Sequence, residues 1–465
     1  MHPLFSNGSL YLHNSLTGQK ELFKPINENC VTLYVCGPTV YNYIHIGNAR
    51  PSIIFDVLYR LLQKLYTGVR YVRNITDIDD KIMAKAKEEK ISVGDISQRY
   101  MDAYFEDMRS LDNLEPTVTP KATEHIPEMI DLIEKLIQRS HAYVADGHVL
   151  FHVPSMSNYG ALSKKSQDDL IVGARVEVAP YKKNAADFVL WKPSTPEQPS
   201  WESPWGKGRP GWHIECSAMI HKHLGLNIDI HGGGQDLIFP HHENEMAQGK
   251  CAHPESCYAK YWVHNGYITV DEEKMSKSLG NFITVRALLE KYSGEVLRYA
   301  LLSTHYRSPL NWSEDFVNQC RQSLTRLYLA IRDFSVASLD ALSVDEQLEI
   351  PFWAALFDDL NTPLALSILH AWVSELNKIS DFDEKRLLAK RIRSASAVLG
   401  LLQKDADTYF QVGDDLSQKV AELIEKRRLA RASKNFIEAD AVRKLLLEMG
   451  VELEDTSSGT KWRAI

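Results

Sequence analysis

Two short segments, far apart in the chain, constrain this protein more than any other feature. The first, His45-Ile46-Gly47-Asn48, follows an alternating apolar run from Val31 to Cys36 and precedes apolar residues at helical spacing. The second, Lys274-Met275-Ser276-Lys277-Ser278, places two ammonium groups three residues apart with hydroxyls between them. A helix N-terminus and lysine side chains both favour phosphate oxygens. Together the segments predict a strand–loop–helix unit with an ATP site, in which His45, Lys274 and Lys277 stabilise charge on the phosphates.

Composition narrows the class of protein. A chain of 465 residues is long enough for about three domains, and 44% apolar content is normal for a globular protein. The sequence shows no secretion signal and no apolar run of bilayer length, and its six cysteines lack the spacing of a disulfide framework. We therefore expect a cytoplasmic monomer with no membrane partner. The formal charge of −8 disfavours a general nucleic-acid coat but not a specific RNA enzyme, because affinity depends on where basic residues cluster.

A second group of residues has the side-chain types of a metal site. If Pro240 opens a helix, His241 and Glu245 lie four residues apart on one face, and His242 with Glu245 is the alternative. Cys36, at the carboxyl end of a predicted strand, and Cys216 can complete the set. Sulfur, imidazole and carboxylate together favour zinc over magnesium or calcium. The plain alternative is a buried apolar cysteine beside histidines that satisfy a helix end.

Two further patterns are weaker. The glycines Gly232, Gly233 and Gly234 would let the backbone approach a nucleotide closely, although a glycine run is more often a turn. Residues 251–257 contain Cys251, His253 and Cys257, but they lack a nearby partner pair, and we interpret them as a surface loop.

The two phosphate-binding segments resemble the signatures of class I aminoacyl-tRNA synthetases. The lysine segment matches letter for letter, whereas Asn48 stands where the family has histidine; its amide can still donate to a phosphate or ribose oxygen. Longer strings extend the resemblance to the cysteinyl-tRNA synthetase family almost end to end: Tyr34 to Tyr41, Arg73 to Asp80, Pro210 to Ser217, His231 to Asp236 and Phe239 to Glu245.

This resemblance implies an activity and a set of site residues. The activity is activation of L-cysteine with ATP and Mg²⁺ to cysteinyl-adenylate, followed by transfer to the 3′-terminal adenosine of tRNA(Cys). It implies that zinc is held by Cys36, Cys216, His241 and Glu245, which decides between the two histidines. A pocket that relies on shape separates cysteine from serine by only about a hundredfold, so a zinc ion that takes the substrate thiolate would act as the selector. Thr76, Trp212 and Asp229 are the expected walls of the cysteine pocket.

The order of patterns along the chain predicts the architecture. We expect a Rossmann-type parallel-sheet domain of the α/β class, with an insertion, then an all-α bundle and a small C-terminal unit. The expected ranges are 1–114 and 211–268 for the two halves of the catalytic domain, 115–210 for the insertion, 269–320 for the lysine-loop region, 321–403 for the bundle and 404–465 for the last unit. The basic residues near 426–434 alone suggest a solvated helix. By resemblance the last unit contacts the anticodon, with Arg431, Asp440 and Asp455 as base readers.

Two rival functions remain to be weighed. One is a related ligase that passes activated cysteine to an amino sugar; such enzymes lack the C-terminal unit that this sequence has. The other is a noncatalytic RNA-binding relative, in which a metal ligand or the lysine segment should be damaged. All of these residues are intact here.

Overall fold

The computed structural model describes residues 9–165, 179–270, 273–274, 282–340, 350–410, 414–448, 451–456 and 459–464. They form two compact units. The first contains the described residues up to 321, together with 350–368 and 398–401; the second contains the described parts of 322–340, 369–397 and everything from 402 onward. No helix in these described stretches has the length and apolar character that crossing a membrane requires.

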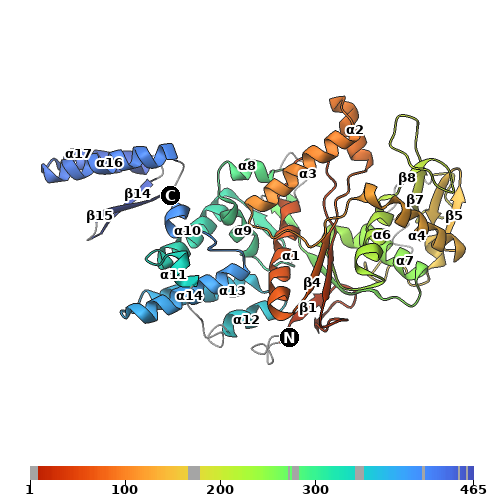
Figure 1. The fold of residues 1–465 in the computed structure, drawn as a ribbon, viewed down its shortest axis with the longest axis horizontal. Helices are drawn as coiled ribbons and strands as arrows, with labels where there is room; N and C mark the ends of the chain where they lie inside the picture. Colours follow the sequence, from red (N-terminus) through yellow and green to blue (C-terminus); the bar gives the residue numbers. More distant parts are fainter. Residues whose placement is uncertain are drawn as a thin grey trace. The chain divides into compact units, whose positions relative to one another are not determined.

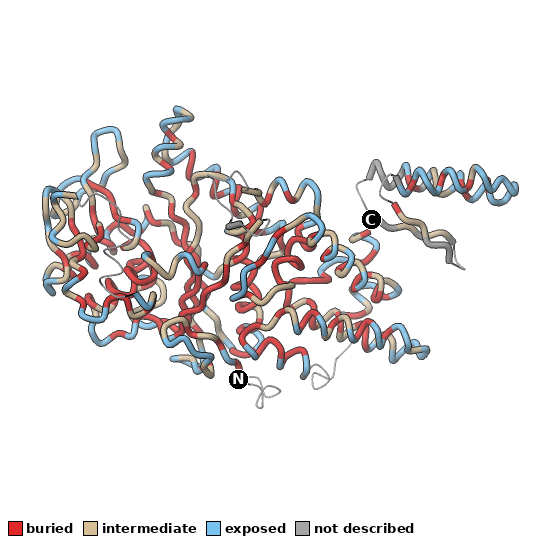
Figure 2. Tube along the Cα trace, turned by 180° about the vertical axis from the view of Figure 1, so that it is seen from behind, coloured by how far each residue is buried: buried red, intermediate tan, exposed pale blue. Residues whose placement is uncertain are grey.

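A four-stranded parallel sheet lies at the centre of the first unit (Figure 1). Its strand order is β10-β9-β3-β4, with bounds Tyr258–Asn265, Asn227–Gly234, Val31–Val35 and Val69–Arg73. Helix α1, Ile46–Leu65, connects β3 to β4 and buries one long face, including Ile54, Leu58 and Leu62. Figure 2 shows the same region as a continuous buried core. The predicted α/β class with a parallel sheet is confirmed.

The chain between β4 and β9 holds two helices and then the insertion expected at 115–210. Helices α2 (Asp80–Glu89), α3 (Val93–Ser110) and α4 (Ile126–Gln138) precede an antiparallel sheet with order β5-β6-β7-β8. Its strands are Ala142–Ala145, His148–Phe151, Phe188–Pro193 and Gly208–Pro210, and short 3-10 turns span Ala122–His125 and Val153–Ser155. One hydrophobic cluster joins this insertion to α6, Trp212–Leu224, and α7, Glu243–Ala252. The insertion therefore packs directly on the helices that carry the metal-site residues.

Smaller elements complete the first unit. The hairpin β1 (Tyr11–Asn14) and β2 (Gln19–Leu22) opens the described chain, and a three-stranded sheet with order β12-β11-β13 uses Glu273–Lys274, Ile268–Val270 and Leu310–Trp312. Helices α8 (Val285–Leu289) and α9 (Gly294–Leu302) follow, and α10 (Glu314–Ile331) continues from the first unit into the second. Turns Gln235–Leu237 and Ile238–His242 lead into α7, so the expected helix begins at Glu243 instead of at Pro240.

The remaining helices confirm an α-helical region after the catalytic part and correct its details. The sequence pattern predicts one long helical stretch over 351–379, but the structure has α12 (Ile350–Phe357) and α13 (Thr362–Leu376). The chain turns between them because Asp359 and Leu360 adopt positive φ angles of 59° and 51°. The buried Asp359 carboxylate holds this turn by accepting hydrogen bonds from the His13 backbone (2.8 Å) and the Tyr306 hydroxyl (2.6 Å).

The second unit ends in a helical hairpin and a β-hairpin. Its helices include α11 (Val336–Asp340), α14 (Phe382–Val398), α15 (Ala406–Phe410), α16 (Asp414–Ala432) and α17 (Phe436–Glu448). Strands β14 (Val451–Thr456) and β15 (Gly459–Ala464) pair antiparallel. A small core of Val420, Val442, Leu446 and Val451 joins the two hairpins. The short sequence-predicted tail is thus a packed substructure with a β-hairpin that the sequence analysis missed.

Candidate active site and metal centre

The predicted ATP-binding segment lies where β3 gives way to α1. His45 is the N-cap of α1, and its Nδ1 accepts a hydrogen bond from the Asn48 backbone N–H (3.2 Å). In return, Asn48 Oδ1 accepts from the His45 backbone N–H (3.4 Å). This reciprocal cap fixes both side chains at the positive end of the helix. The cap uses the oxygen of the Asn48 amide, which is compatible with the predicted use of its NH2 group as a donor to ATP.

The segment that follows the lysine signature packs against this cap. Ile46 donates its backbone N–H to Ile283 O, and Val285 donates to Ile44 O, both at 3.0 Å. The Phe282 ring meets the His45 ring edge-on, with centroids 4.6 Å apart. The structure therefore places residues 282–285, which follow the lysine signature, against the N-terminus of α1. The backbone of Lys274 lies in β12, whereas Lys277 falls outside the described residues.

A cleft of about 490 Å³ opens beside the cap. Its walls follow the carboxyl ends of β3, β9 and β10, where ligands bind in open parallel sheets. Among the lining residues are Cys36, His45, Asn48, Trp212, Gly234 and Asp236. One cleft therefore joins the candidate ATP site to the candidate metal site.

The four predicted metal ligands converge at one end of this cleft. Cys36 Sγ lies 3.8 Å from Cys216 Sγ and 3.4 Å from Glu245 Oε1. His241 Nε2 lies 3.5 Å from Cys216 Sγ and 3.0 Å from Glu245 Oε1. Zinc bonds of about 2.0 to 2.3 Å in a tetrahedron imply donor separations of roughly 3.3 to 3.8 Å. The donor chemistry and these separations fit a zinc ion with little rearrangement.

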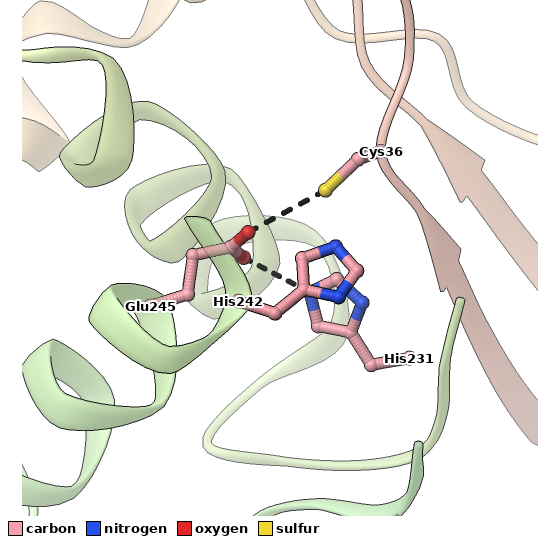
Figure 3. Close-up of side chains that lie close together, drawn as sticks. All are labelled: Cys36, His231, His242 and Glu245. Carbon is pink, nitrogen blue, oxygen red and sulfur yellow. Dashed lines mark hydrogen bonds and ion pairs between the residues drawn. The ribbon is translucent and has the colours of Figure 1, made fainter. Parts of the chain in front are cut away.

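A second set of donors overlaps the first. Cys36, His231, His242 and Glu245 also lie close enough to share an ion, and Figure 3 shows both imidazoles beside the Glu245 carboxylate. His231 Nε2 lies 2.9 Å from Glu245 Oε2, while His242 Nδ1 contacts His264 Nε2 at 2.8 Å. This second set offers a single sulfur. The first set, with two sulfurs, is the softer and therefore the better zinc site.

The cluster has a distinctive pattern of charge. Burial disfavours charge on His241, yet the adjacent Glu245 carboxylate raises the pKa of His241 to about 10. Contact with the Cys36 thiol, and then with His241, lowers the pKa of Cys216 to about 6 in spite of burial. Burial raises the pKa of Cys36 well above its usual range. Cys216 and Glu245 are thus held as anions around one cation, and a bound cation would meet the same negative charge.

Comparison with known proteins identifies the family. The model of the class I (C) tRNA synthetase catalytic domain matches residues 22–322, and the DALR domain model matches residues 351–403. The cysteine–tRNA ligase of Saccharophagus degradans is 51% identical, over 98% of this chain and 100% of that relative. The one from Parvibaculum lavamentivorans is 53% identical, over 98% of this chain and 97% of the relative.

The chain belongs to the cysteine–tRNA ligase family. It is therefore a class I aminoacyl-tRNA synthetase and a ligase, as the sequence predicted. Solved structures agree on the fold. The methionyl-tRNA synthetase of Mycobacterium tuberculosis in complex with methionyl-adenylate superposes with a TM-score of 0.55 at 15% identity, covering 80% of this chain and 89% of that one. The LeuRS of a LeuRS–tRNA–LeuAMS complex from Agrobacterium radiobacter K84 gives 0.58 at 11% identity, covering 81% and 84%.

Within this member of the cysteine–tRNA ligase family, the glycine run mainly serves packing. A Cβ on Gly232 would lie 2.3 Å from the Phe55 ring of α1, and one on Gly233 would lie 2.8 Å from His242. Only Gly234 among the three lines the cleft. Gly232 and Gly233 are required to be glycine because neighbouring side chains fill the space, and the approach of the run to a nucleotide stays a prediction.

Two of the three expected pocket walls lie near the metal cluster. Trp212 lines the cleft and stacks on the His241 ring, with centroids 4.1 Å apart. The Thr76 hydroxyl is buried and donates to Glu215 Oε2 (3.2 Å), next to Cys216 on α6. It thus supports the pocket from behind.

The third expected wall, Asp229, is misplaced. Its carboxylate accepts from the Ile26 backbone (2.5 Å) and from both the backbone and hydroxyl of Thr32 (2.8 Å each). Thr32 lies near the beginning of β3, so this contact is at the amino ends of the parallel strands, opposite the cleft. The carboxylate that lines the cleft is Asp236, just after β9, and the rule that ligands bind beyond the carboxyl ends of strands would have pointed to it.

The remaining candidates are the predicted anticodon contacts and the cysteines of residues 251–257. Arg431 on α16 and Asp440 on α17 are exposed, and Asp455 lies in β14 without a described side chain. Cys251 is buried and Cys257 is exposed. Cys251 lies in helix α7 and Cys257 lies just before β10, so the expected surface loop covers only part of 251–257. Neither cysteine belongs to a metal-type cluster within the described part of the chain.

Proposed function

We propose that this protein is a cysteine–tRNA ligase that activates L-cysteine with ATP and Mg²⁺ and transfers it to the 3′-terminal adenosine of tRNA(Cys). The observation that carries the proposal is the single cleft that joins the capped helix N-terminus to the two-cysteine cluster. Relatives about half identical over nearly the whole chain are named for this activity. We expect it to work as a monomer in the cytoplasm.

In this proposal a zinc ion is held by Cys36, Cys216, His241 and Glu245. When bound, zinc supplies a soft centre that prefers a thiolate to a hydroxyl, which separates cysteine from serine where shape alone cannot. His213 Nδ1 lies 2.9 Å from His241 Nδ1, and burial lowers the pKa of His213 to about 3. His213 therefore stays neutral and orients the His241 ring, leaving Nε2 facing the cysteines.

The remaining steps fall to residues of the cleft. His45 and the N-terminus of α1 face the ATP phosphates, and Asn48 supplies an amide beside them. Lys274 and Lys277 neutralise charge as pyrophosphate leaves, so no protein nucleophile is needed. Asp236 offers a carboxylate for the substrate ammonium group, and the exposed Trp212 closes one wall. Arg431, Asp440 and Asp455 remain our proposed anticodon contacts.

The decisive experiment is transfer of labelled cysteine to unfractionated tRNA by zinc-replete protein, with serine in parallel. We expect acid-precipitable cysteine and no serine. Pyrophosphate exchange driven by cysteine without any label on tRNA would favour the amino-sugar ligase. Absence of both signals would favour a noncatalytic relative.

A single substitution tests the zinc assignment separately. Cys216→Ser should lose bound zinc and, with it, the preference for cysteine over serine in pyrophosphate exchange. Cys251→Ser is the matched control, because Cys251 is also buried but lies outside both metal-type clusters. Selectivity retained in a zinc-free Cys216→Ser protein would refute the role of zinc as selector.

A further inference from the structure

The first unit contains buried arginines whose partners can be compared. Arg50 is fully buried and donates to the backbone carbonyls of Gly266, Tyr267, His305 and Ser308. Arg298 is also fully buried, pairs with Asp56 and donates to the carbonyls of Leu111, Asp112 and Leu399. Such partners are what a buried guanidinium needs, because an unpaired charge away from water is costly.

Arg73 departs from this pattern. It is 5% exposed, and the described residues give its guanidinium no carbonyl partner; its Nε, like that of Arg50, is buried without a hydrogen-bond partner. No carboxylate in the described part of the chain forms an ion pair with it. Its neighbours are instead aromatic: the guanidinium lies over the Tyr104 ring, 5.9 Å from the centroid, and contacts Tyr71. These rings shield the cation without neutralising it.

The position of Arg73 indicates which group would neutralise its positive charge. Arg73 is the last residue of β4 and pairs in register with Val35, the residue before Cys36. It also lines the cleft. Its positive charge therefore lies at the end of the cleft that holds the cysteine cluster, on the strand next to β3. Burial opposes that charge, but Tyr104 and Tyr71 raise the pKa of Arg73, so the group stays a cation.

The substrate of the proposed function carries an anion at the matching place. If the sulfur of cysteine faces Cys36 and Cys216, its α-carboxylate is only two carbon atoms further on. Asp236 lines the same cleft and suits the ammonium group, which leaves the carboxylate to be matched. The planar guanidinium fork binds a carboxylate through two parallel hydrogen bonds, which a lysine cannot do.

From this we propose that Arg73 binds the α-carboxylate of the amino acid substrate and holds it for attack on ATP. The proposal rests on the proposed function, since it takes cysteine as the substrate. It makes Arg73 a residue that selects for a free carboxylate, separate from the metal cluster that selects for the thiol.

The test compares two ligands that differ by the carboxylate. Binding of cysteine and of cysteamine is measured by calorimetry on the zinc-replete full chain, for the wild type, Arg73→Met and Arg73→Lys. Loss of charged hydrogen bonds should weaken cysteine binding roughly 10- to 100-fold in Arg73→Met. Cysteamine, which lacks the carboxylate, should bind both proteins within about twofold, and Arg73→Lys should recover part of the cysteine affinity.

Arg70→Met is the matched control, because Arg70 lies on the same strand but is exposed. It should leave both affinities unchanged. Cysteamine binding also reports whether the Arg73 variants keep an intact thiol site. In the wild type alone, cysteine should bind more tightly than cysteamine by the factor that Arg73→Met removes.

Four results would overturn the proposal. Equal weakening of cysteine and cysteamine would make Arg73 a structural residue, and unchanged cysteine binding would remove it from the pocket. Intact cysteine activation with loss of transfer to tRNA would assign Arg73 to an RNA phosphate. A wild type that binds cysteamine and cysteine equally, or neither, would refute the carboxylate site, and the transfer assay then shows separately whether the proposed function survives.

Discussion

Gly232→Ala should destabilise the first unit through a side chain on α1. The new Cβ would lie 2.3 Å from two atoms of the Phe55 ring, and ordinary contacts begin at about 3.4 Å. Phe55 is fully buried, so the ring or α1 itself must shift by about 1 Å. Overpacking of this kind costs about 1 to 3 kcal/mol, offset by about 0.5 to 1 kcal/mol because alanine suits a strand better than glycine. The expected net loss lies between about 0 and 2.5 kcal/mol, with a central value of about 1 kcal/mol.

A double-mutant cycle that combines Gly232→Ala with Phe55→Leu isolates this contact. Leucine removes the outer ring atoms, so the double variant should lose less stability than the sum of the single changes, by about 1 kcal/mol or more. Gly234→Ala is the neighbouring control. Its Cβ would meet only Asp236 Oδ1, the movable end of an exposed side chain, at 2.4 Å. It should keep the stability of the wild type within about 0.5 kcal/mol while raising KM for cysteine.

The stability of the first unit is measured by urea unfolding of the zinc-replete full chain, with pyrophosphate-exchange activity as the signal. Because α1 begins at the His45 cap, Gly232→Ala should also raise KM for ATP. Additive losses in the double variant would refute the packing explanation. Equal destabilisation by Gly232→Ala and Gly234→Ala would refute it as well.

Two further predictions concern buried ionisable groups. Asp56→Asn leaves the buried Arg298 without its carboxylate partner, so it should lower the free energy of unfolding in urea titrations by about 3 to 5 kcal/mol. Glu314→Gln is the control, because Glu314 forms an exposed ion pair with Lys291, and it should change the free energy of unfolding by less than about 1 kcal/mol. Burial, and then His231, lowers the pKa of His264 to about 3, so the unfolded chain binds a proton below about pH 6.5 that the folded chain does not. Stability should therefore fall as pH drops from 7.5 to 5.5, and His264→Gln should reduce that fall by about 1 kcal/mol; an identical fall in both proteins would contradict this.

The sequence predicted the chemistry of the cleft better than its geometry. Cys36 could be placed because it directly follows an apolar strand pattern, and parallel strands deliver the residues after them to one end of the sheet. His45 could be placed because it directly precedes apolar residues at helical spacing. Asp229 was misplaced because a strand has two ends, and nothing local distinguishes a carboxylate that ties strands together from one that lines a cleft. The packing role of Gly232 could not be predicted for a related reason, since the ring that requires glycine lies on a helix distant in sequence.

Helix α6 explains why the metal cluster and the substrate pocket should respond as one. Trp212 and Cys216 lie four residues apart on it, so both side chains face the same way; the first stacks on His241 and the second contacts its Nε2. Glu215, between them, accepts a hydrogen bond from Thr76 beyond the end of β4. A change at any metal ligand therefore alters the support of the Trp212 wall. Loss of the metal should change Trp212 fluorescence and cysteine affinity together, even for variants that leave every residue in direct contact with cysteine in place.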